Sequence, residues 1–308
     1  MTDSFLSAAR YGKDKVRVLR VKRDPSNPSK QDVLEMVVRV LLEGEIDESY
    51  TRADNGPIVP TDTVKNTIYI IAKMHDVWPI ERYAAVLAHH FVTKYSHIHK
   101  CHVDIKQLKW SRYQVNGKLH DHSFVRDGLE TRFVSLSKSD KSGYEIQSGM
   151  TGLKVLKSTG SMFYGYHKCD FTTLKETTDR ILSTDVNANW VWNPSSVKTL
   201  DQVHSLANNG VFDHVYDSAN RITLERFALE NSASVQATMY NMASDILSVS
   251  NHVKDVSYEL PNNHYFEINL DWHHNLPNTG LNAEVYAPQS DPSGLIRCTV
   301  SSKSRSKL

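Results

Sequence analysis

Apolar and charged residues nearly alternate through residues 15–23, and a second, longer run with strand character extends from Val33 to Glu45. A period of two is typical of a β-strand with one buried face. Residues 24–31, between the two runs, are rich in Pro, Ser and Asn, which favour a turn. The pattern therefore predicts a β-hairpin near the start of the chain.

The period changes to that of a helix after Pro60. The apolar positions of this segment recur on one helical face: Val64, Ile68, Ile71 and Ala72. Thr61 or Thr63 is the expected N-cap, because a hydroxyl oxygen can accept a free N–H group of the first turn. Another helix is expected from Pro79 toward Tyr95, since proline is tolerated in a first turn.

The rest of the chain mixes shorter strand and helix patterns. Residues 101–115 and 122–136 are expected to form a long hairpin around an Asn116-Gly117 turn. Further strands are expected at about 144–157, 161–167, 190–192, 256–260, 265–270 and 295–300, and helices near 173–182 and 232–251. We expect residues 137–145 and 199–220 to form loops or peripheral helix.

Two segments of the chain resemble each other. Residues 61–69 and 232–240 share, in register, two hydroxyl residues, a valine, a threonine, a large apolar residue and a tyrosine. Each segment would begin a core-facing helix after a pair of strands, which favours a duplicated strand-strand-helix-strand-strand unit. We therefore expect an α+β protein with two tandem units, residues 1–140 and 141–300, each an antiparallel sheet backed by helices.

Composition excludes several classes of protein. The 36 Lys and Arg residues balance 35 Asp and Glu residues, so a nucleic-acid or membrane-surface partner is not expected. No run approaches the roughly 20 apolar residues that a membrane helix needs. Three separated cysteines without a C-x-x-C pair argue against a disulfide framework and a cysteine zinc site, and favour a reducing compartment.

The last three residues match a targeting signal. The chain finishes Ser306-Lys307-Leu308, the tripeptide that the peroxisomal import receptor reads. It follows a polar run in the tail of residues 301–308, which we expect to be mobile and accessible. The sequence therefore predicts a peroxisomal protein.

Familiar catalytic and cofactor motifs are missing from the sequence, including G-x-G-x-x-G, the Walker loop, H-E-x-x-H and G-x-S-x-G. A metal site built from His97 and His99, or from His120 and His122, is an alternative, because residues two apart on a strand share a face. No further ligands converge on either pair in the sequence, so histidines hydrogen-bonded near sheet ends are favoured over a metal site.

Other candidate residues stand where predicted elements begin or end: Lys13, Thr61, Asp62, Val235, Gln236, Asn262 and His264. Helix starts expose N–H groups that suit an anionic ligand. Each of these residues also has a simple structural explanation as a strand end, helix cap or turn. Periodicity alone therefore assigns none of them to catalysis.

Distinctive blocks recur in order along nearly the whole chain: Tyr11–Lys13, Leu41–Gly44, Thr61–Tyr69, His120–Phe124, Val155–Phe163, Asp179–Asp185, Ser234–Thr238, Leu260–Phe266, Asp291–Ile296 and the Ser-Lys-Leu end. In this combination the chain closely resembles the urate oxidase (uricase) family in its fungal form. The resemblance implies the tunnelling fold (T-fold), whose sheets join into barrels that stack as a homotetramer, with active sites at subunit interfaces. It also implies oxidation of urate by O2 to 5-hydroxyisourate and hydrogen peroxide, without a metal or organic cofactor.

The resemblance assigns substrate-binding roles that suit urate, a planar anionic purine. Arg180 would supply a planar cationic fork, and Phe163 would stack on the ring. Gln236 would bind the opposite edge of the purine, assisted by the backbone N–H of Val235. Taken without the resemblance, Arg180 would be a surface ion pair with Asp179 or Asp185, and Phe163 a core aromatic.

The resemblance also assigns the chemistry. Lys13, Thr61 and His264 would form a proton relay, in which the lysine accepts a proton through the threonine and the histidine orients water. Asn262 would hold O2 and then water above the ring. Asp62 would bind substrate through its backbone as the neighbouring subunit's contribution.

Other functions stay open beside urate oxidation. The chain could be a purine-binding protein of the same fold without catalysis, or a metal-dependent oxidase that uses one of the histidine pairs. A pterin-processing enzyme of the same fold is a third alternative.

Overall fold

The computed structural model describes residues 4–303. The targeting prediction for Ser306, Lys307 and Leu308 therefore lies outside the described residues. The strands are β1 (Tyr11–Arg23), β2 (Gln31–Gly44), β3 (Ile98–Leu108), β4 (Ser111–Val115), β5 (Lys118–Val125), β6 (Thr131–Ser139), β7 (Tyr144–Lys157), β8 (Leu182–Trp192), β9 (Val253–Glu267) and β10 (Tyr286–Ser301). The helices are α1 (Asp47–Thr51), α2 (Thr61–Met74), α3 (Ile80–Lys94), α4 (Leu200–Asn208), α5 (Val211–Leu229) and α6 (Val235–Val249), with short 3₁₀ turns at Pro194–Ser196 and Gly280–Asn282.

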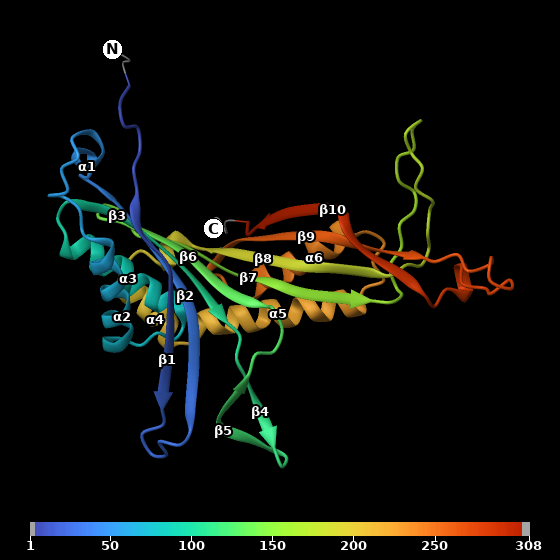
Figure 1. The fold of residues 1–308 in the computed structure, drawn as a ribbon, viewed down its shortest axis with the longest axis horizontal. Helices are drawn as coiled ribbons and strands as arrows, with labels where there is room; N and C mark the ends of the chain where they lie inside the picture. Colours follow the sequence, from blue (N-terminus) through green and yellow to red (C-terminus); the bar gives the residue numbers. More distant parts are fainter. Residues whose placement is uncertain (1–3, 304–308) are drawn as a thin grey trace, which may run out of the picture.

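One antiparallel sheet of eight strands forms the frame of the molecule, in the order β1-β2-β3-β6-β7-β8-β9-β10. Helices α2 to α6 pack on one face of it, and β4 and β5 project as a separate hairpin (Figure 1). This arrangement confirms the predicted α+β class. Strands β1 and β10 lie at the two edges of the sheet, so each presents one row of backbone groups without a neighbouring strand among residues 4–303.

The alternation in the sequence explains which sheet face the helices cover. Along β2, alternate side chains from Leu34 to Leu42 are buried at 0–1% exposure, and the residues between them are less buried or exposed. The buried positions face the helices, whose own apolar stripes complete the core. Among the described residues, no helix is long and apolar enough to cross a membrane.

The two similar segments both begin core-facing helices, but their first residues differ. Helix α2 buries the predicted face, Val64, Ile68, Ile71 and Ala72. Its N-cap is Pro60, without a side-chain hydrogen bond, so the prediction of Thr61 or Thr63 as N-cap is wrong. Helix α6 has a hydroxyl cap instead, because Ser234 Oγ accepts the N–H of Ala237 at 3.1 Å.

Several predicted elements are wrong because long-range pairing overrides local pattern. Residues 173–182 form no helix, and residues 161–167 contain only isolated bridges, at Ser161 and Phe163. Strand β9 runs through residues 261–265, which were expected to form a turn between two strands, since β8 and β10 pair with Asn262 from both sides. Strand β3 pairs with β6, while the Asn116-Gly117 turn closes the smaller β4–β5 hairpin, with positive φ at both turn residues.

Both halves of the chain place helices between pairs of sheet strands. The expected boundary at residue 140 falls between β6 and β7, which are hydrogen-bonded neighbours in one sheet. The division into units 1–140 and 141–300 stays a prediction.

Candidate active site

One group of predicted residues lines a common pocket beside the loop of residues 158–181. Phe163 and Arg180 come from this loop, and Asn262 and His264 come from β9. The loop extends from one end of the sheet, next to the arm that joins β9 to β10 (Figure 1). The pocket therefore combines an aromatic ring, a cation and two polar side chains.

Short backbone bonds hold the two sides of this loop together. The N–H of Phe163 donates to the Thr177 carbonyl at 2.8 Å, and the N–H of Thr177 donates back at 3.0 Å. The Arg180 guanidinium lies over the Phe163 ring, 5.2 Å from its centroid. The other neighbour of that ring is Tyr166, stacked at 4.8 Å. A cation and an aromatic face are thus placed side by side.

Arg180 is a cation without an acidic partner. Its Nε lies 3.4 Å from Ser161 Oγ, and none of the ion pairs within residues 4–303 includes it. Burial lowers the pKa of Arg180, because desolvation disfavours the charged form. An anion that entered the pocket would supply the missing countercharge.

The alternative prediction of a surface ion pair between Arg180 and Asp179 or Asp185 is wrong. The Asp179 carboxylate accepts the Thr159 hydroxyl at 2.8 Å and the N–H of Gly160 at 3.0 Å. Asp185 accepts the Asn263 amide at 2.9 Å and lies 3.8 Å from Lys154. Both carboxylates are therefore engaged elsewhere.

Strand β9 places the other two pocket residues on one face. Asn262 and His264 are two residues apart in a continuous strand, so their side chains point the same way, opposite to Asn263. The His264 ring stacks on Phe266 with centroids 5.8 Å apart. Continuous pairing, rather than a turn, thus gives these side chains a shared orientation.

The start of α6 lies beside this group. Val235 and Asn262 line a second, mostly apolar pocket together with Thr184. Val235 and Gln236 are the first two residues of the helix, and Gln236 is exposed. Because first-turn N–H groups lack intrahelical acceptors, these two can serve a ligand.

A second group of predicted residues lies where β1 meets α2. Lys13 belongs to β1, and Thr61 and Asp62 are the first residues of α2, exposed to solvent. Asp62 accepts a hydrogen bond from Lys65 and another from Asn66 at 3.0 Å. The Lys65 hydrogen bond, more than the charge of Lys13, holds the pKa of Asp62 below its usual range.

Gly12 fixes the path of the chain next to Lys13. A Cβ atom at Gly12 would lie 1.9 Å from the carbonyl oxygen of Val40 on β2. Only glycine lets β1 lie this close to β2 at that point. None of the ion pairs within residues 4–303 includes Lys13, although its charge contributes to the lowered pKa of Asp62.

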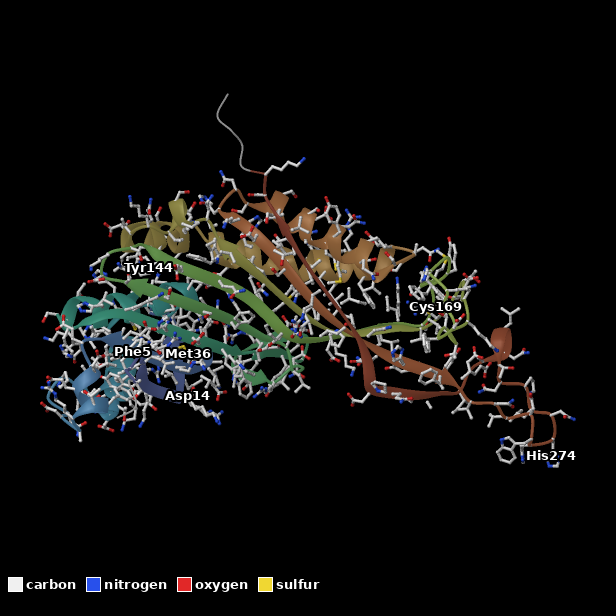
Figure 2. The ribbon with its side chains drawn as sticks, turned by 90° about the horizontal axis from the view of Figure 1, so that it is seen from above. Phe5, Asp14, Met36, Tyr144, Cys169 and His274 are labelled. Carbon is white, nitrogen blue, oxygen red and sulfur yellow. The ribbon has the colours of Figure 1, made fainter. Side chains whose placement is uncertain are left out.

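The two groups are far apart in one chain. Figure 1 shows α2 at one end of the sheet and the loop of residues 158–181 at the other. Figure 2 labels Asp14, next to Lys13, and Cys169, in the loop, on opposite sides of the molecule. A single chain therefore brings together Phe163, Arg180, Asn262 and His264 with the start of α6, but not Lys13 or Thr61 with them.

One histidine of each pair has another polar partner. His99 lies between Glu45 and Asp140, at 3.1 and 3.4 Å, and His122 contacts the Ser29 carbonyl at 3.1 Å. No group of three or more His, Cys, Asp or Glu side chains in the described part of the chain is arranged to hold a metal ion. The metal-dependent alternative thus has no donor set there.

Sequence patterns missed the residues that hold the site together. Asp179, Ser161 and Thr177 act through partners distant in sequence, which no local period encodes. Ser161 and Asp179 belong to the recurring blocks Val155–Phe163 and Asp179–Asp185, but the sequence does not indicate these contacts.

Comparison with known proteins gives one consistent result. The Uricase family profile matches residues 9–137 and 146–297. The chain is 55% identical over 303 residues to a uricase of Cyberlindnera jadinii, covering 98% of this chain and 99% of that one. It is 53% identical over 306 residues to a uricase of Aspergillus flavus, covering 99% and 100%. The crystal structure of a uricase from Arthrobacter globiformis matches with a TM-score of 0.85 and 32% identity, covering 100% of this chain and 98% of that one.

Proposed function

Because this chain belongs to the uricase family and is a urate oxidase, we propose that it oxidises urate with O2 and water to 5-hydroxyisourate and hydrogen peroxide, using protein groups alone. The Arg180 cation carries the proposal, because it lies beside the Phe163 ring and has no acidic partner within residues 4–303. Urate is flat and anionic, so it matches a cationic fork next to a stacking surface.

The start of α6 supplies the second edge of the binding site. The Gln236 amide both donates and accepts, as the opposite edge of the purine requires. The backbone N–H of Val235 lies at the positive end of the helix dipole and favours the anionic form of the ligand.

We propose that a second copy of the chain completes the site. Lys13, Thr61 and Asp62 cannot reach the Arg180 pocket of their own chain, because they lie at the other end of the sheet. The open edges of β1 and β10, 13 and 16 residues long, suit strand pairing between copies. A homotetramer of tunnelling-fold subunits, each with units 1–140 and 141–300, satisfies both requirements.

The proton relay operates across this interface. Lys13, through the Thr61 hydroxyl, accepts a proton from urate and makes the ring electron-rich. The deprotonated urate ring then gives two electrons to O2, which takes up two protons and leaves as hydrogen peroxide, with Asn262 holding the oxygen over the ring. Water, oriented by His264, takes the oxygen position and adds to C5, while Asp62 holds substrate through its backbone.

The proposed product, hydrogen peroxide, is consistent with the location that the end of the sequence predicts. We propose that Ser306, Lys307 and Leu308 direct the enzyme to the peroxisome through the import receptor. An organelle that disposes of peroxide is compatible with this reaction.

Chelator-treated protein in aerated buffer with urate tests the function. We expect urate absorbance to fall with release of one peroxide per urate, in a preparation that elemental analysis finds free of metal. Binding of urate without loss of absorbance would favour a purine-binding protein. Activity that needs a restored metal would favour the metal-dependent oxidase, and stronger competition by a pterin would favour a pterin enzyme.

A further inference from the structure

Ser232 joins the two segments that carry Phe163 and Gln236. Its N–H donates to the Gly160 carbonyl at 3.1 Å, and its own carbonyl accepts the N–H of Met162 at 2.9 Å. Its hydroxyl is hydrogen-bonded to Thr238 on α6 at 3.0 Å. Ser232 is only 2% exposed, so its contacts are shielded from water.

A lysine donates hydrogen bonds to the junction that Ser232 forms between the Phe163 segment and α6. Lys157 ends β7, and its Nζ donates to Ser232 Oγ at 3.1 Å and to the Glu230 carbonyl at 2.7 Å. The same ammonium lies 5.4 Å from the centroid of the Phe227 ring. The Glu230 carboxylate instead accepts Arg226 at 3.3 Å and Asn241 at 3.0 Å.

Neutral acceptors are an unusual environment for a half-buried ammonium. Burial lowers the pKa of Lys157, although the Glu230 charge partly opposes this. Since hydrogen bonds from a charged donor are shorter and stronger than neutral ones, they fix the positions of both acceptors. Both acceptors belong to the short link that precedes α6, at the point where it touches the Phe163 segment.

We propose that Lys157 is a positioning residue for urate. Through Ser232, its ammonium sets the distance between the Phe163 and Arg180 side of the pocket and the Val235 and Gln236 side. This inference rests on the proposed roles of Phe163 and Gln236 in binding urate. A purine held from two edges requires a fixed spacing between them, because a small displacement weakens both contacts.

Steady-state kinetics of Lys157→Met test the inference. Loss of two charge-assisted hydrogen bonds should raise the KM for urate about ten-fold, while kcat changes less than about three-fold. Lys157→Arg keeps a cationic donor and should recover a large part of the lost affinity. Lys198→Met is the matched control, because Lys198 is an exposed lysine outside this junction and should leave KM unchanged.

Ser232→Ala in combination with Lys157→Met supplies a second measurement. If the lysine acts through Ser232, the effects of the two substitutions on KM should be less than multiplicative. The Ser232→Ala variant also carries the test should Lys157→Met fail to fold, as judged by its thermal unfolding.

Two results would overturn the inference. One is a lower Tm with an unchanged KM, which would mean that Lys157 supports the fold only. The other is an equal loss in Lys157→Met and Lys198→Met. Gln236→Ala separates these from failure of the proposed function: if it leaves the KM for urate unchanged, or the unmodified chain does not oxidise urate, the underlying site assignment is wrong.

Discussion

The starts of α2 and α6 derive from similar sequence segments but are built differently. At α6, Ser234 caps the helix, and the buried Ser232 ties it to the neighbouring loop. At α2, Pro60 precedes the helix without a side-chain cap, and Thr61 is exposed. The α6 start is held by hydrogen bonds from both Ser232 and Ser234, which suits a group that holds substrate in a fixed place. The α2 start leaves a hydroxyl free, which suits a group that exchanges protons.

The largest effect is expected at the α2 start. Lys13→Met or Thr61→Ala should lower kcat by about 10²- to 10⁴-fold, because each removes a member of the proposed proton relay. Binding of a non-reactive urate analogue, measured by calorimetry, should change little. A loss of analogue binding as large as the loss of turnover would contradict the assignment of these residues to chemistry.

A smaller, different effect is expected at Arg180, in the pocket beside the α6 start. Arg180→Ala should weaken analogue binding by about 10- to 100-fold, because it removes a charged hydrogen-bond donor from the pocket. Titration of the analogue against the variant measures this directly. Equal losses of binding and turnover in all three variants, Lys13→Met, Thr61→Ala and Arg180→Ala, would remove the proposed division of roles.

The smallest expected effect is on stability, and it should differ between the two helix starts because only α6 has a side-chain cap. Ser234→Ala should lower the free energy of unfolding by about 1 kcal/mol, since the hydroxyl accepts the N–H of Ala237. Thr61→Ala should cost much less, because Thr61 is not the cap of α2. Calorimetric melting of both variants tests the contrast, and equal shifts in Tm would mean that the caps do not distinguish the two starts.

Sequence patterns predicted the elements whose burial follows a local period. The apolar faces of α2 and α6 are as expected, and the alternation in β1 and β2 gave the first hairpin. The loop of residues 158–181 was misjudged because its shape depends on bonds between distant residues, such as Phe163 with Thr177. Asn262 was expected in a turn, whereas pairing with both β8 and β10 keeps it in a strand.

The residues of the candidate site could be predicted from the sequence only in part. The family resemblance nominated its residues, and the structure brings four of them to one pocket. The family resemblance gave no role to Lys157 or Ser232. Their proposed role comes from the hydrogen bonds between distant segments and not from a motif. Local chemistry explains single residues, whereas their assembly requires the fold.

The distance between Lys13 and Arg180 along one chain has a genetic consequence. Chains that carry Lys13→Met should turn over very slowly, and chains that carry Arg180→Ala should be poorly active at low urate concentration. When the two are co-expressed, the proposed assembly would pair the intact lysine of one chain with the intact arginine of the other. Activity should then reappear by complementation between two defective alleles, whereas a site contained within one chain would leave the mixture as inactive as its parents.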